Sequence, residues 1–203
     1  MNKKIIATVG ACALCLGLGV AGTLAWLTDT TGEVKNTFTT SDINITLTET
    51  ESNVDNDGSP NTNSYQMIPG FTITKDPKVT VSAGSEDCYL FVKLEESDNY
   101  SAYLENYKIS DGWKQLKNGE TDVDGVYYRE VESNDTSDQP FYVLKNNQLT
   151  VKSSVTKADM EAIDDSSDAT SEPTLTVKAY ATQLYKTNNE KMDVYNAWLE
   201  VGE

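Results

Sequence analysis

The chain has 203 residues, with 32 acidic residues, 16 basic residues and no histidine, and its formal net charge is −16 at pH 7. This balance excludes nucleic-acid binding, because neutralising phosphates requires clustered lysine and arginine. The absence of histidine excludes catalytic triads and zinc sites that depend on imidazole. A pair of carboxylates could still act as acid and base. The sequence selects no such pair, so no catalytic or cofactor-binding residue is assigned.

The first 25 residues are typical of a signal peptide. They begin with a lysine pair, contain no acidic residue, and are apolar or small over residues 5–25. Small residues at the end of this run predict cleavage after Ala25, which leaves residues 26–203 as a single secreted domain. Two alternatives stay open: an uncleaved membrane anchor, and a lipoprotein modified at Cys12.

Large apolar side chains follow the predicted cut, at Trp26, Leu27, Val34 and Phe38. The ends of a domain are usually disordered unless they dock, so a tryptophan here is expected to be buried. It could pack against its own domain. It could also belong to a strand that pairs with the open sheet edge of a neighbouring subunit, as in donor-strand assembly.

Downstream of residue 40 apolar and polar residues alternate, which predicts half-buried strands. The alternating runs are 43–47, 79–81, 88–94 and 175–181, and shorter β-rich runs lie at 126–131, 141–144 and 149–151. Turn sequences such as Asn118-Gly119 and Asp124-Gly125 separate the runs. Together these features predict an all-β protein with an antiparallel β-sandwich. Cys88 is the only cysteine after residue 25, and its alternating run predicts a buried thiol.

Two short helices are predicted at the periphery of the sandwich. In the first, Thr156 and Asp159 form a capping box ahead of residues 158–163. The second ends at Gly202 and has an apolar stripe. Its members are Met192, Val194, Tyr195, Trp198 and Leu199.

Two ligand classes have weak support in the sequence. Asp55 and Asp57 precede Gly58 as in the first half of a calcium loop, but the twelfth position is Ser64 instead of the bidentate glutamate. An acidic turn is therefore favoured, and the two aspartates stay as calcium candidates. Asp122, Asp124 and Gly125 form a still weaker match to the same calcium loop. Eleven tyrosines could stack on sugar rings, although tyrosine is also common in strands.

Three blocks of sequence resemble the TasA/camelysin family of Gram-positive bacteria, whose members are processed by a SipW-type signal peptidase. The first block comprises Gly22-Thr23-Leu24-Ala25-Trp26-Leu27-Thr28-Asp29, Asn36-Thr37-Phe38-Thr39 and the run from Ile43 to Glu49. The second comprises Met67-Ile68-Pro69-Gly70 and Lys75-Asp76-Pro77, and the third comprises Ala179-Tyr180-Ala181-Thr182-Gln183 and Ala197-Trp198.

The resemblance implies a jelly-roll sandwich, secretion to the cell surface or biofilm matrix, and fibres in which the N-terminal strand of one subunit completes the next. The expected partners are therefore other copies of the chain or related matrix subunits, with cell-wall polymers as a further possibility. A monomeric adhesin or glycan-binding module is the alternative function. The camelysin branch also carries a metallo-endopeptidase label, but this chain offers no recognisable catalytic set for it.

Overall fold

The structure is a computed structural model that describes residues 43–50, 65–164, 172–186 and 188–202. Its elements, in chain order, are β1 (Ile45–Thr48), β2 (Thr72–Thr74), β3 (Lys78–Val81), β4 (Cys88–Glu96), α2 (Tyr100–Tyr103), β5 (Lys114–Asn118), β6 (Thr121–Val131), β7 (Gln139–Tyr142), the 3-10 turn η1 (Lys145–Asn147), β8 (Gln148–Thr150), α3 (Lys157–Asp164), β9 (Leu175–Gln183) and α4 (Val194–Val201). All strand pairs are antiparallel, so the predicted all-β class is confirmed.

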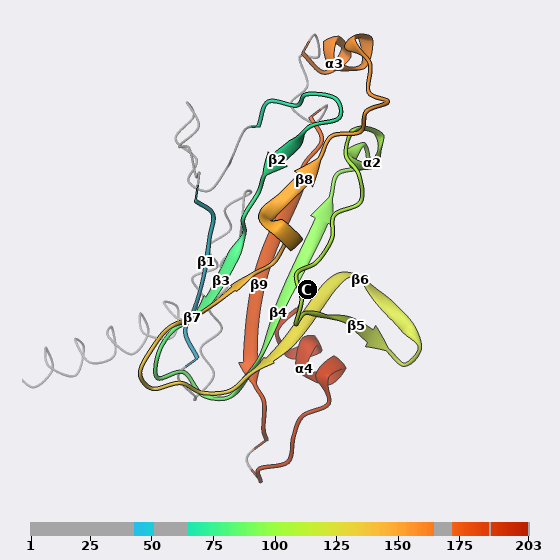
Figure 1. Cartoon of the computed structure of the whole chain (residues 1–203). Coiled ribbons are helices and arrows are strands. Elements are labelled where there is room, and N and C mark those ends of the chain that lie inside the picture. The colour runs from blue at the N-terminus through green and yellow to red at the C-terminus, as the bar shows by residue number, and fades with distance from the viewer. Residues whose placement is uncertain (1–42, 51–64, 165–171, 187, 203) are drawn as a thin grey trace, which may run out of the picture.

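The strands form two facing layers (Figure 1). One layer is a four-stranded sheet in the order β5-β6-β4-β9. The other contains a three-stranded sheet, β1-β3-β7, and a two-stranded sheet, β2-β8. Hydrogen bonds from Lys75 N–H to the Asn147 carbonyl and from Val143 N–H to the Pro77 carbonyl, both 2.9 Å long, continue the pairing between these two sheets. The second layer is therefore one long, bent ladder, and the architecture is sandwich-like.

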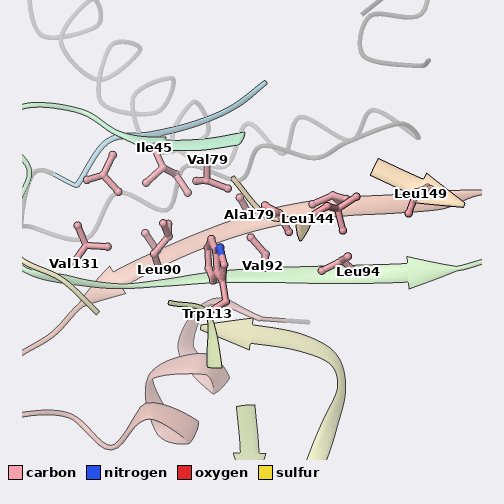
Figure 2. Close-up of a cluster of buried hydrophobic side chains, with 14 of the residues drawn as sticks. Ile45, Val79, Leu90, Val92, Leu94, Trp113, Val131, Leu144, Leu149 and Ala179 are labelled. Atoms are coloured by element: carbon pink, nitrogen blue, oxygen red, sulfur yellow. The ribbon is translucent and has the colours of Figure 1, made fainter. Parts of the chain in front are cut away.

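The main core fills the space between the layers (Figure 2). Aliphatic side chains dominate it because alternate residues of each strand point inward. Its members include Ile45, Val79, Val81, Leu90, Val92, Leu94, Val131, Leu144, Leu149 and Ala179. Cys88 also belongs to this core and is completely buried, as predicted.

A second core covers the opposite face of the four-stranded sheet. Tyr89 and Phe91 of β4 and Tyr180 of β9 pack there against Trp198 of α4. The Trp198 ring lies 5.3 Å from the Tyr180 ring and 5.4 Å from the Phe91 ring, measured between centroids. Strand β4 is consequently buried on both faces, because one face meets the second layer and the other meets the helix.

Helix α3 has the capping box that the sequence predicts. The Thr156 N–H donates to Asp159 Oδ2 at 2.8 Å, and the Asp159 N–H donates to Thr156 Oγ1 at 3.3 Å. These reciprocal bonds satisfy N–H groups that the first turn leaves without helical partners. Helix α2 was not predicted, since its four residues are too few to show a helical period.

Helix α4 begins at the N-cap residue Asp193, whose side chain accepts a 3.0 Å hydrogen bond from the Asn196 N–H. Its buried face consists of Ala197, Trp198 and Val201. The predicted apolar stripe was wrong at Leu199, which is 60% exposed. The neighbouring Trp198 has the larger apolar surface, and the helix is oriented so that this residue meets the sheet.

The predicted turns have different outcomes. Asn118-Gly119 connects β5 to β6, and Gly119 has the positive φ (63°) that such a turn requires. The turn predicted at Asp124-Gly125 was wrong, because both residues lie inside β6. Asp122 and Asp124 therefore lie along an extended strand, and not in a loop that could wrap around a cation.

Candidate functional site at the open sheet edges

Strand β9 forms a nine-residue edge of the four-stranded sheet. Leu184 N–H donates to the Asp87 carbonyl at 3.0 Å and Ser97 N–H donates to the Thr174 carbonyl at 3.1 Å, just beyond the two ends of the β4–β9 register. Hydrogen bonding alternates along an antiparallel pair, so the even-numbered residues of β9 bond to β4. The N–H and C=O groups of the odd-numbered residues, from Leu175 to Gln183, point away from it. Among the described strands, β4 is the one that pairs with β9.

Strand β1 forms a second edge on the same side of the sandwich, and it lies against β9 although the two belong to different layers. The Ser82 N–H donates to the Asn44 carbonyl at 2.9 Å. By the same alternation, Thr46 and Thr48 bond to β3, whereas the main chain of Ile45 and Leu47 faces outward. Among the described strands, this side of the molecule thus has two edges close together that have no second pairing partner.

Polar contacts fix β1 at both of its ends. After the strand, Glu49 forms a 2.8 Å ion pair with the largely buried Lys75, whose ammonium group lies 5.8 Å from the centre of the Tyr65 ring. Before the strand, the Asn44 N–H donates to Ser85 Oγ at 3.2 Å. These contacts hold β1 in place. The chain that precedes Ile43 therefore starts from a fixed position beside the open edges.

The site residues that the sequence predicts lie outside the described residues. They are the cleavage residue Ala25, the assembly residues Trp26, Leu27, Val34 and Phe38, and the calcium candidates Asp55 and Asp57. The structure accordingly describes the proposed acceptor edges, and it leaves the proposed donor segment and calcium candidates as predictions.

Six acidic residues of the described chain form ion pairs with lysine side chains: Glu49, Glu95, Asp111, Asp122, Glu130 and Glu161. Glu95 bonds to Lys93 at 2.7 Å and to Lys178 at 3.1 Å. Burial alone would raise the pKa of Glu95, but the hydrogen bonds from these lysines outweigh it and lower the pKa below its usual value. Within the described ranges, no three Cys, Asp or Glu side chains gather in a way that could hold a metal ion.

Cys88 has the environment of a structural thiol. It is completely buried, and burial together with the nearby Asp87 carboxylate raises its pKa to about 12. Nucleophilic cysteines need a thiolate, which is scarce at neutral pH when the pKa is this high. The thiol therefore contributes to packing.

The tyrosines are distributed through both cores and over the surface. Tyr89, Tyr100 and Tyr180 are buried, six others are half-buried, and Tyr142 and Tyr185 are exposed. The two exposed rings belong to different segments, β7 and the chain after β9. Most of the tyrosine content is thus explained by core packing.

Sequence reasoning missed one unusual residue, Arg129 on β6. It is the only arginine of the chain. The signal that could have identified it is a cation at an inward position of a β-rich run, because Tyr127 and Val131 on the same face both belong to the main core.

No protein-family model matches this chain, and no curated protein or solved structure is significantly similar to it. Among the described residues, no helix is both long enough and apolar enough to cross a membrane.

Proposed function

We propose that this protein is a secreted structural subunit of a cell-surface or matrix fibre, in which the segment starting at Trp26 adds a strand to a neighbouring subunit. The open edge of β9 is the observation that carries the proposal. Five consecutive odd-numbered residues direct main-chain hydrogen-bonding groups away from β4 along this edge. The resemblance to TasA/camelysin proteins supports the same function.

Within the described residues, the edge of β9 has no proline, unpaired lysine or bulge that would protect it against strand addition. Soluble proteins block exposed edges with proline, with outward lysines or with bulges. Residues 175–183 contain no proline, and their one lysine, Lys178, is engaged by Glu95. The β4–β9 register runs without a shift over all nine pairs. Such an edge is suited to main-chain pairing with an added strand.

The proposed donor segment is long enough to reach a second molecule. An extended chain rises about 3.3 Å per residue, so residues 26–42 can span about 56 Å, whereas the nine residues of β9 span about 30 Å. The large apolar residues of the segment would supply the side chains that such a strand buries. The fixed position of β1 directs the start of this segment to the side of the molecule that has the open edges.

Deletion of residues 26–38 tests the proposal. We expect the truncated protein to remain a folded monomer and the 26–203 chain to form filaments, as measured by light scattering, electron microscopy and near-ultraviolet circular dichroism. Adding the 26–38 peptide in trans should cap the truncated monomer without restoring filaments. Filaments from the truncated protein would contradict the mechanism. Unfolding of the truncated protein would also contradict it, because the segment would then complete its own domain.

A second arm of this experiment examines the acceptor edge. The N–H of Gln183 faces outward, so Gln183→Pro should preserve the fold while its ring obstructs an incoming strand. Gln183→Ala keeps the N–H and serves as the matched control. We expect filament formation to fall strongly for the proline variant alone. Equal assembly of both variants would exclude this end of β9 as the acceptor.

A further inference from the structure

The arginine side chain at position 129 points into the space between the two layers. Arg129 lies on β6 opposite Leu90 of β4, and its neighbours on the same face, Tyr127 and Val131, pack in the main core. A fully apolar side chain would be the ordinary choice at such a position. The sole arginine of the chain instead occupies the side of the sandwich where β6 faces β7.

Aromatic rings hold the guanidinium group. Its Cζ atom lies 3.8 Å from the centre of the Phe141 ring on β7 and 5.4 Å from the centre of the Trp113 ring. Trp113 is itself fixed, because its indole N–H donates to the Tyr142 carbonyl at 2.9 Å. Stacking of this kind restricts the planar group and leaves its edge for hydrogen bonding.

A glycine leaves space for the edge of the guanidinium. Gly112 has a φ of +90°, and a Cβ atom at this position would lie 3.1 Å from Nη2 of Arg129. A side chain at this position would press on the guanidinium and displace it. The turn at Gly112 and the rings of Trp113 and Phe141 therefore hold the guanidinium group of Arg129 in one position.

No described residue supplies a counter-charge to this cation. The side chain of Arg129 forms neither a hydrogen bond nor an ion pair with the described residues, whose ion pairs with one another all involve lysine. Its Nε atom is buried without an acceptor, whereas Nη1 and Nη2 are not among the buried unpaired atoms and so reach the surface. Burial also lowers the pKa of the guanidinium. Nη1 and Nη2 are therefore the donors of this guanidinium that a ligand can reach.

We propose that Arg129 binds a ligand through a single carboxylate group, with Trp113 and Phe141 packing beside it. The fork of guanidinium donors matches the two oxygens of a carboxylate. A singly charged ligand is favoured over a phosphate or a polyanion, because the net charge of −16 repels multiply charged anions. An acidic amino-acid side chain and a uronic acid sugar present the same carboxylate chemistry.

The single arginine makes the test direct, because a ¹⁵N-labelled chain gives one arginine Nε–Hε resonance in its NMR spectrum. The α-amide of N-acetylglutamate, which carries the side-chain carboxylate alone, is titrated at constant ionic strength, as are glucuronate, inorganic phosphate and chloride. We expect the resonance to shift and saturate with a carboxylate. The carboxylate that binds more tightly shows whether the natural ligand is an acidic amino-acid side chain or a uronic acid sugar. No shift beyond that caused by chloride, or tighter binding of phosphate than of either carboxylate, would overturn the proposal.

Variants separate binding at Arg129 from a general charge effect. Arg129→Lys keeps the charge but loses the fork, so carboxylate affinity, measured by isothermal titration calorimetry, should fall by about tenfold or more. Lys117→Gln removes a charge from an exposed position of the same sheet and should leave the affinity unchanged. If Arg129→Lys does not fold, the NMR titration of the unmodified chain still decides. Equal affinities of the two folded variants would contradict the assignment.

Discussion

Replacing Trp198 with alanine is expected to lower the free energy of unfolding by about 3–5 kcal/mol, the usual cost of truncating a buried aromatic residue. Trp198 is 5% exposed and packs against Phe91 and Tyr180 in the second core. Its removal would leave a cavity between α4 and the sheet. The four-stranded sheet would then lose most of the apolar cover on that face. Urea unfolding followed by circular dichroism measures the change.

Leu199→Ala is the matched control for this prediction. Leu199 is the next residue of α4 but is exposed, so its truncation should change the stability by no more than about 0.5 kcal/mol. The pair therefore distinguishes burial from helix propensity. Similar losses for both variants would mean that the helix does not cover the sheet through Trp198.

Gly125→Ala is expected to destabilise the protein by about 3 kcal/mol or more, from a strained backbone and a steric overlap. Gly125 has a φ of +65°, and an alanine Cβ would overlap the Leu94 carbonyl oxygen of the neighbouring strand. This atom belongs to the main chain, so it can move only if β4 moves with it. Thermal and chemical unfolding measure the loss.

Gly119→Ala separates the two causes. Gly119 has nearly the same φ, +63°, but no heavy atom lies within 4 Å of the point that an alanine Cβ would occupy. Backbone strain alone then applies, and we expect a loss of about 1 kcal/mol. The difference between the variants reports the overlap with Leu94. Equal losses of stability for Gly125→Ala and Gly119→Ala would contradict the close approach of β6 to β4 at Gly125.

The sequence predicted those elements whose evidence is local. Alternation identified the strands around Ile45, Val79, Leu90 and Ala179, and the capping box at Thr156 identified α3. Asp124-Gly125 misled because glycine after aspartate usually marks a turn, whereas here the close approach of Leu94 requires the glycine. That requirement depends on strand pairing, which no local pattern contains.

The candidate sites depend even more on contacts between distant residues. Which face of α4 is buried is decided by the rings of Phe91 and Tyr180, about a hundred and about twenty residues away in sequence respectively. The environment of Arg129 likewise depends on Phe141, in the other layer. Which strands lie at the edge of a sheet depends on the order of the strands, and no local sequence pattern contains that order. The donor segment stays a prediction, and it is the one candidate that the sequence indicated directly, through its apolar residues before the first strand.

The pairing of β4 with β9 has a consequence for how the chain acquires its structure. The paired residues are separated by 79 positions at one end, from Glu96 to Leu175, and by 95 at the other, from Cys88 to Gln183. Closing such a large loop is entropically costly, and high contact order slows folding. The central ladder cannot form until nearly the whole chain has emerged from its site of synthesis. Late folding of this kind would suit the proposed secretion, because a chain crosses a membrane before it becomes compact.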